Sequence, residues 1–325
     1  MKSLFTLFLV AIFCIIAGPK PIFGQKIKSK APVTEKKDST VKDTLKKVTV
    51  EDKVKSSKKI DGFFTLYQDT ATGSLQIYIR KSQLNTEYLY QSFSMGGPPD
   101  LGLNQNMIRE TWLFKIRKNF DKINWTRSNT AYYYDKNNPI SRAANVDVSE
   151  TVFYSEKLIA EDSLGYLING DNLFLSEKLD PVKPNMPPSI PPTAYLNLGS
   201  LNKDKSEYIK LRSFPANTDV IVNLAYENPA PQNFGGPDIT DARYINVKMQ
   251  HSFVELPKND FVPGFDHPHV GYFTAQAADM TSPDIPVYHD YINRWHLKKK
   301  DPNVKLSEPV EPIVWWVENT TPLEL

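Results

Sequence analysis

The run Asp266-His267-Pro268-His269 is the strongest candidate in this sequence for metal chemistry. Side chains two residues apart on an extended chain face the same side, so the two imidazoles could reach one metal ion. Zinc takes three or four such ligands, and His289 or His251 could supply another, although no spacing requires it. The alternative is a polar turn that leads into the following strand. Metal ligation by this run is therefore one of two interpretations.

Signatures of catalysis are missing elsewhere in the sequence. No two of the five histidines are four residues apart, so the HExxH element of zinc peptidases is absent. Neither a GxSxG nucleophile elbow nor a GxxxxGK phosphate loop occurs. Several carboxylates could serve in pairs, but spacing singles out none of them: Glu110, Asp147, Glu150, Asp238 and Asp241. We predict no catalytic residue, no bound cofactor and no enzymatic activity for this chain alone.

Three consecutive tyrosines, Tyr132-Tyr133-Tyr134, are a candidate binding surface. Successive residues of a strand point to opposite faces, so at least one of these rings could meet solvent. Aromatic rings on a β surface can stack on sugars or contact peptides. The alternative is core packing in which only the hydroxyl groups reach water.

The first residues are typical of a signal peptide. Lys2 precedes an apolar run from Leu4 to Ala17, which Gly18-Pro19 interrupts. The run is shorter than the roughly 20 residues of a membrane-spanning helix, so we expect cleavage near residue 25 rather than an uncleaved anchor. The protein is then exported, to the periplasm, the outer surface or the medium. Cys14 is the only cysteine, so the exported chain has no disulfide and no thiolate ligand.

Residues 26–59 differ in composition from everything that follows. They hold 12 lysines, five acidic residues and no aromatic side chain, which predicts a disordered basic tether. The tether carries a net charge of +7, whereas residues 60–325 carry −7. An acidic body lacks the clustered lysine and arginine that phosphate contacts need, so we expect no nucleic-acid partner. The tether is a solvated spacer or a contact to an anionic surface.

From Ile60 onward, short aromatic and branched runs alternate with turn residues, which predicts a mostly β fold. We expect a small amino-terminal antiparallel sheet over residues 60–95, including a hairpin of 63–68 with 75–80, and a larger sandwich or barrel-like domain over 96–290. The larger domain's expected strands are 109–118, 122–127, 130–134, 151–160, 208–213, 220–226, 244–254 and 272–277. A single helical turn is expected near Asp171, and Pro181–Pro192 should be a surface loop. Residues 291–325 are expected to be a connector, in which Pro312–Glu318 has the composition of a buried strand.

Four segments carry a resemblance to a known family: Asp61-Gly62-Phe63-Phe64, Val270-Gly271-Tyr272-Phe273, Tyr291–Pro302 and Ser307–Val314. The chain from about Ile60 to Leu325 resembles the front part of large secreted bacterial zinc-dependent metalloproteases. Those proteins carry two domains of unknown function ahead of a metzincin-like peptidase domain with an HExxHxxGxxH zinc site. The family's corresponding run is Asp-x-Arg-Val-Gly-Tyr-Phe, with arginine where this chain has His269.

The resemblance implies a non-catalytic pro-region or accessory region, truncated before the HExxH domain, that supports folding, latency or substrate positioning. The implied partner is a peptidase domain or a separate metalloprotease chain, and zinc is expected only there. Without that partner, Trp315 and Trp316 should be partly exposed to solvent. The competing interpretation is a free-standing β module at the cell surface or in the periplasm that binds peptide or glycan.

Overall fold

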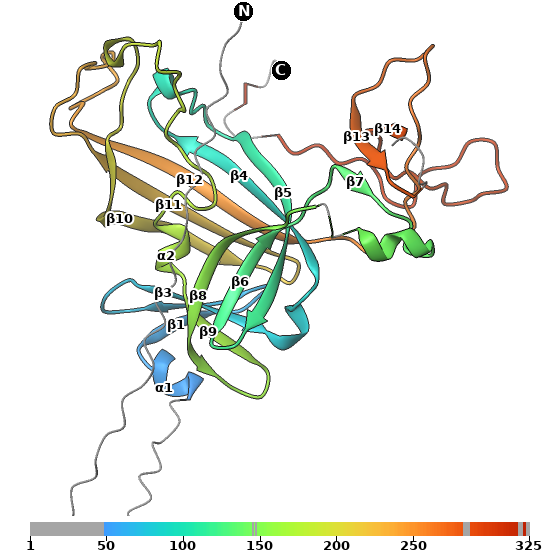
Figure 1. Ribbon diagram of the computed structural model, residues 1–325, viewed down its shortest axis with the longest axis horizontal. Helices are drawn as coiled ribbons and strands as arrows, with labels where there is room; N and C mark the ends of the chain where they lie inside the picture. The colour runs from blue at the N-terminus through green and yellow to red at the C-terminus, as the bar shows by residue number, and fades with distance from the viewer. Residues whose placement is uncertain (1–48, 145, 147, 282–286, 318–320, 323–325) are drawn as a thin grey trace, which may run out of the picture. The chain divides into compact units, whose positions relative to one another are not determined.

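The computed structural model describes residues 49–144, 146, 148–281, 287–317 and 321–322. The described chain is mostly β (Figure 1). Eleven strands belong to one large sheet: β1 (Ser57–Ile60), β2 (Thr65–Asp69), β3 (Leu75–Arg80), β4 (Glu87–Gly96), β5 (Met107–Asn119), β6 (Lys122–Arg127), β8 (Thr151–Glu161), β9 (Gly165–Asn169), β10 (Ser200–Ser213), β11 (Asn217–Glu227) and β12 (Tyr244–Glu255). Three form a second sheet: β7 (Tyr132–Tyr133), β13 (Thr274–Asp279) and β14 (Val287–Ile292). The helices are short: α1 (Val50–Val54), α2 (Asp171–Phe174), η1 (Lys81–Gln83), η2 (Pro99–Leu101), η3 (Pro139–Ala143) and η4 (Pro192–Ala194).

The large sheet has the order β1-β2-β3-β9-β8-β6-β5-β4-β12-β11-β10, and every neighbouring pair is antiparallel. Its two ends approach each other through the segment that joins β1 to β2. The Phe63 amide donates to the Phe214 carbonyl at 2.6 Å, and the Phe64 amide donates to the Thr218 hydroxyl at 3.0 Å. The sheet is therefore nearly closed and barrel-like, which confirms the predicted fold class.

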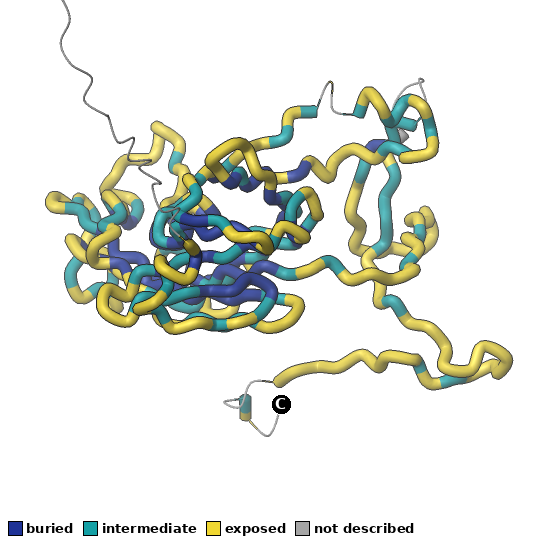
Figure 2. The backbone as a smooth tube through the Cα atoms, turned by 90° about the horizontal axis from the view of Figure 1, so that it is seen from below, coloured by how far each residue is buried: buried dark blue, intermediate teal, exposed yellow. Residues whose placement is uncertain are grey.

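An aromatic cluster fills the interior of this sheet. Trp125 of β6 stacks on Phe114 of β5, with ring centroids 5.3 Å apart, and Phe253 of β12 meets both rings edge-on. Phe64 joins them from the segment that closes the sheet. These side chains face inward because alternate residues of a strand share one face. Figure 2 shows the buried residues gathered within the large sheet, whereas the carboxyl-terminal segment is mostly exposed.

The structure differs from the sequence-based expectation at the amino-terminal strands. Residues 60–95 do not make a sheet of their own, because β3 pairs with β9 and β4 lies between β5 and β12. Their inward residues Leu75, Ile77 and Ile79 belong to the same hydrophobic cluster as Trp125. The described residues from Thr49 onward belong to one compact unit. Residues 60–95 and the larger domain, which the sequence suggested were separate, are therefore joined by strand pairing between distant segments.

The end of the expected disordered tether is also ordered. Thr49 caps α1, its hydroxyl accepting from the Asp52 amide at 3.2 Å, and the same hydroxyl donates to the Asp52 carboxylate at 2.7 Å. Val50 is buried beside Ala160 and Leu167, on the outside of β8 and β9. Residues 49–59 are therefore ordered, contrary to the expected disorder. A capping box and the burial of one valine are enough to stabilise a single helical turn here. Residues 26–48 of the tether and the signal peptide lie outside the described residues.

Most strand predictions in the larger part of the chain agree with the structure, and two do not. The strand expected over Pro312–Glu318 is absent, because residues 313–317 have no regular secondary structure. The same residues are exposed, which confirms the expected solvent exposure of Trp315 and Trp316. The predicted strand over 130–134 shrinks to the two residues of β7. The helical turn near Asp171 and the proline-rich loop are present as expected. Within the described residues, no helix is long and apolar enough to cross a membrane.

Candidate functional site

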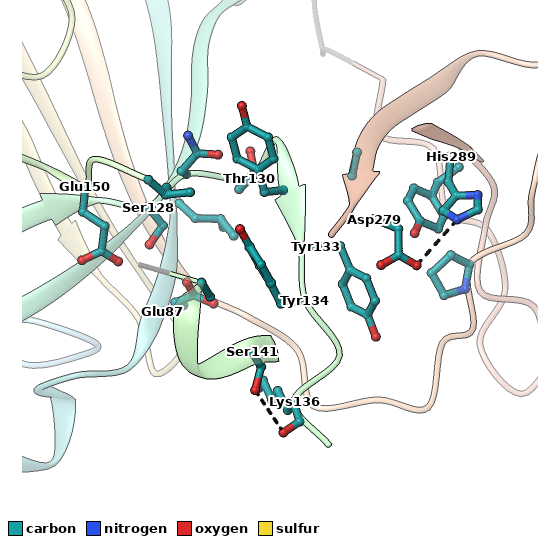
Figure 3. A pocket seen from close by; sticks show the side chains of 18 of the residues that line it. Glu87, Ser128, Thr130, Tyr133, Tyr134, Lys136, Ser141, Glu150, Asp279 and His289 are labelled. Atoms are coloured by element: carbon teal, nitrogen blue, oxygen red, sulfur yellow. Dashed lines mark hydrogen bonds and ion pairs between the residues drawn. The ribbon is translucent and has the colours of Figure 1, made fainter. Parts of the chain in front are cut away.

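A cleft of about 930 Å³ lies between the outer face of β4 and β5 and the three-stranded sheet. Its lining combines aromatic rings with charged groups from segments distant in sequence (Figure 3). The β7 segment and the loop that follows it line the space between the two sheets. Such a volume is typical of pockets that bind small ligands or short segments of polymer.

The wall formed by the large sheet carries an ion-pair network. The Lys115 ammonium lies 3.2 Å from the Glu87 carboxylate and 3.5 Å from the Glu150 carboxylate. Glu150 also accepts from the Arg117 guanidinium at 2.6 Å. Because each carboxylate has a cationic neighbour, this wall presents a balanced charge rather than a strongly acidic one. Ser128, next to this wall, has a buried hydroxyl with no hydrogen-bond partner among the described residues.

The opposite wall is formed by the three-stranded sheet. The His289 Nε2 atom of β14 lies 3.7 Å from the Asp279 carboxylate of β13. The pKa of Asp279 is lowered, chiefly because its carboxylate accepts hydrogen bonds from Thr281. Phe265 packs its ring 5.0 Å from His289 and 5.4 Å from Tyr291, centroid to centroid. This wall therefore offers flat aromatic surface beside one histidine–aspartate contact.

The three predicted tyrosines all line the cleft. Tyr132 and Tyr133 form β7, which pairs parallel with the end of β13, and both side chains are exposed. Figure 3 shows Tyr133 and Tyr134 in the space between the two walls. The structure thus favours the surface interpretation of these rings over the core interpretation. Exposed rings beside ion-paired carboxylates can stack on a sugar or hold an extended peptide by its side chains.

The predicted metal-binding run does not line this cleft, and its residues Asp266 and Pro268 line a second, smaller pocket that also includes His289. The rings of His267 and His269 are 5.2 Å apart, and the Nδ1 atom of His267 accepts from the His269 amide at 3.2 Å. The Asp266 amide donates to the Asp290 carbonyl, which fixes the run beside β14. Neither proposed third ligand joins them: His289 faces Asp279, and His251 is in the core. Across the described ranges, no group of three or more metal-ligating side chains is assembled.

The core histidine has a different environment from the exposed ones. Its Nδ1 atom lies 2.8 Å from the Tyr90 hydroxyl, and its Nε2 atom has no partner among the described atoms. Burial lowers the pKa of His251 to about 4, although the nearby Asp180 carboxylate acts in the opposite direction. His251 is therefore neutral at pH 7 and belongs to the interior of the sheet.

A second polar cluster, which the sequence did not indicate, lies beside His251. The Arg109 guanidinium donates to both oxygens of the buried Asp180 carboxylate, at 2.9 and 3.1 Å. The Ser92 hydroxyl donates to the same carboxylate at 2.7 Å. Asp180 lies in the irregular segment after α2, so the local sequence gave no indication that it would pair with Arg109. The cluster is fully bonded, which is typical of a structural network.

The carboxylates that the sequence raised as possible pairs are scattered. Of these, Glu150 alone lines the cleft. Asp241 is paired with Arg243 in the loop after β11, and Asp238 lines a shallow pocket in the same loop. Glu110 is half-buried on β5, and Asp147 lies outside the described residues. Among the four of these carboxylates that the structure describes, no two are brought to one site as a pair for acid–base catalysis.

The structure is a mostly β domain with exposed aromatic groups in a cleft between its two sheets. The sequence profile of a family described as Domain of unknown function (DUF5117) matches residues 104–300, and the chain belongs to this family. The match covers β5 to β14, yet β4 from outside it completes the sheet between β5 and β12. No curated protein and no solved structure matches the chain significantly.

Proposed function

We propose that this chain is the non-catalytic accessory region of an exported zinc metalloprotease, and that its carboxyl-terminal segment packs against the peptidase part. The observation that carries the proposal is the exposure of an apolar run. Trp315 is 80% exposed and Trp316 is 93% exposed, and their neighbours Val314 and Val317 are exposed as well. Contiguous apolar surface of this kind marks a protein contact more often than a solvated loop.

Neighbouring segments extend the same apolar surface. Trp295 lies 6.4 Å from Trp315, centroid to centroid, and its side chain is also exposed. The Lys300 amide donates to the Glu308 carbonyl and the Val310 amide to the Lys298 carbonyl, so this part of the chain forms a narrow loop. Burying two tryptophans would contribute several kcal/mol of association free energy, at about 25 cal/mol per Å² of apolar surface.

The family resemblance supports this division of roles. Phe63 and Phe64, in one of the segments that carry the resemblance, are buried and help to close the large sheet. Phe273, in another, is exposed. Phe63 and Phe64 therefore have a structural role in closing the sheet, whereas the exposed Phe273 suits contact with a partner. Zinc would then be bound by the peptidase part, and the region would assist its folding, latency or substrate positioning.

Latency, if the region confers it, would have to be steric or use a side chain other than cysteine. Cys14 is the only thiol and falls within the predicted signal peptide. Asp266 and the adjacent His267 and His269 are exposed and could face a partner's zinc ion. Export itself is part of the proposal and rests on the signal-like first residues.

The test is co-expression of this chain with an HExxH-containing polypeptide encoded in the same or the adjacent reading frame, followed by size-exclusion chromatography. We expect a stable complex in which iodide no longer quenches Trp315 and Trp316. The double variant Trp315→Ser/Trp316→Ser should lose the complex, and the control Phe234→Ser, which changes an exposed side chain in another loop, should retain it. Absence of such a reading frame, or a complex insensitive to the double variant, would overturn the proposal. So would chelator-sensitive casein cleavage by the chain alone.

A second function, binding of a peptide or glycan in the cleft, is favoured by the tyrosine lining. Isothermal titration with casein-derived decapeptides and with cellohexaose distinguishes the two ligand classes. Tyr133→Ala should weaken whichever interaction is found by about tenfold, since one stacked ring is worth 0.5–1.5 kcal/mol beyond its buried area. Tyr244→Ala changes an exposed tyrosine that lies outside the cleft and serves as the control. Binding that ignores Tyr133 would place the ligand elsewhere.

A further inference from the structure

Two large apolar side chains project from neighbouring turns at one end of the large sheet. Phe120, in the turn between β5 and β6, is 89% exposed, and Leu164, in the turn between β8 and β9, is 71% exposed. Both turns lie at the same end of the strands, because Lys122 at the start of β6 is opposite Lys157 near the end of β8. Neither side chain belongs to the hydrophobic clusters of the core.

The backbone at Phe120 makes its exposure more unusual. The turn has two residues, Phe120 and Asp121, between the paired Asn119 and Lys122. Phe120 has a φ of 50°, a left-handed conformation that glycine or asparagine adopts more readily than an aromatic residue. A phenylalanine here carries a conformational cost that packing within the chain does not offset. Such a residue suggests a role outside the fold.

Hydrogen bonds attach each turn to a neighbouring segment of the sheet. The Leu158 amide of β8 donates to the Asp121 carbonyl at 2.9 Å. The Lys81 amide, which follows β3, donates to the Leu164 carbonyl at 2.8 Å. The Lys81 and Lys118 ammonium groups both lie over the Tyr166 ring, 5.6 and 5.4 Å from its centroid. The exposed apolar side chains thus extend from a rigid base.

The same end of the sheet is rich in lysine. Lys122 and Lys157 are opposite each other on adjacent strands, a like-charge arrangement that is unfavourable unless an anion lies nearby. Lys81 and Lys118 make four cations in total. The acidic groups here are Asp121, Glu161 and Asp162, and Glu161 is half-buried.

One of these carboxylates is already occupied. Asp162 accepts hydrogen bonds from the Tyr78 hydroxyl at 2.7 Å and from the Leu164 and Gly165 amides at 2.8 and 2.7 Å. Its charge therefore stabilises the turn and competes weakly for the lysines. The Lys118 ammonium donates to the Phe120 carbonyl at 2.8 Å, so one of the four cations lies directly beside the exposed ring.

We propose that this end of the large sheet docks on an anionic lipid bilayer. Phe120 and Leu164 enter the boundary between headgroups and acyl chains, and Lys81, Lys118, Lys122 and Lys157 contact lipid phosphates. Exposed aromatic and aliphatic tips surrounded by lysine suit this interface, because the rings leave water while the ammonium groups stay at the headgroup level. Binding is reversible and weakens with ionic strength, since only two side chains are buried.

Co-sedimentation of the full chain with vesicles tests the proposal, using phosphatidylcholine alone and phosphatidylcholine mixed with phosphatidylglycerol. Wild type should bind the anionic vesicles more tightly than the neutral ones. Phe120→Gly/Leu164→Ser should bind the anionic vesicles at least tenfold more weakly, and glycine at position 120 should leave the melting temperature equal or higher. Lys122→Glu/Lys157→Glu should lose most of the preference for anionic vesicles.

Phe234→Ser is the matched control, because Phe234 is 71% exposed in the loop between β11 and β12, at the opposite end of the strands (Figure 1). The lysine-rich residues 26–59 are present in every variant, so their attraction to anionic lipid cancels in the comparison. Equal binding by wild type and Phe120→Gly/Leu164→Ser would overturn the proposal. Equal losses in the control and the test variant would overturn it as well.

Discussion

Acid stability should depend measurably on His251, the buried histidine of β12. Its side chain is enclosed by Tyr90, Phe174 and Phe253, and burial lowers its pKa to about 4. The charged groups near it are the paired Asp180 and Arg109. In the unfolded chain the same imidazole has an ordinary pKa of about 6.5.

The sign follows from which state binds the proton. Because the folded pKa is lowered, the unfolded chain takes up a proton first as pH falls, so stability present above about pH 6.5 is lost on the way down to pH 4. At 1.36 kcal/mol for each pKa unit, the loss between pH 7 and pH 4 is about 3 kcal/mol. That is a large part of a typical stability of 5–15 kcal/mol.

Urea unfolding at pH 7 and at pH 4 measures this contribution. His251→Gln should be less stable than wild type at pH 7, because it disturbs a packed site, but should lose about 3 kcal/mol less between the two pH values. Carboxylate titrations are common to both proteins and cancel in the difference. His267→Gln, which removes an exposed histidine, is the control and should follow the wild-type pH dependence.

Two results would refute the reasoning. If wild type and His251→Gln lose the same free energy of unfolding between pH 7 and pH 4, the histidine does not stay neutral in the folded interior. If an NMR titration of the His251 ring gives a pKa near 6.5, the ring is accessible to water, and the conclusion that it is buried among aromatic side chains is wrong.

Other substitutions probe the fold at separate places. Asp180→Asn should cost about 3 kcal/mol of unfolding free energy in urea titrations, because the partly buried Arg109 guanidinium loses the buried carboxylate that neutralises it. Gly62→Ala should cost about 2 kcal/mol, since an added Cβ would lie 2.6 Å from the carbonyl carbon of Ser213 at the closure of the sheet. Trp316→Ser should change stability by less than about 0.5 kcal/mol and remove part of the iodide-quenchable fluorescence.

Each of these has a matched comparison in the same chain. Gly271→Ala adds a Cβ that meets nothing within 4 Å, so it should leave the thermal midpoint unchanged where Gly62→Ala lowers it. Asp241→Asn breaks an exposed ion pair and should cost under about 1 kcal/mol. Similar losses for Asp180→Asn and Asp241→Asn would contradict the buried network.

The sequence by itself determined the strands whose side chains alternate most regularly. The alternation of Trp112, Phe114 and Ile116 within the expected strand 109–118 predicts one buried face, and all three side chains are buried. This succeeds because the two-residue period of a strand is a local property of the chain. The sequence did not predict β9. Its residues 165–168 are buried on both faces of the strand, so they show no alternation of apolar and polar side chains. The exposure of Trp315 and Trp316 was expected, but the strand around them does not form, because apolar composition alone does not provide a pairing partner.

Only the tertiary structure decided which strands are neighbours and which side chains meet. The local sequence pattern could not show that β4 lies between β5 and β12, or that Arg109 forms its ion pair with Asp180. The spacing of His267 and His269 correctly placed their rings close together. A third metal ligand would depend on contacts between distant segments, and His251, one candidate, is buried in the core. The cleft likewise exists because two sheets face each other across the tyrosines. Periodicity fixes which way a side chain points, whereas its partners depend on hydrogen bonding and burial across the whole chain.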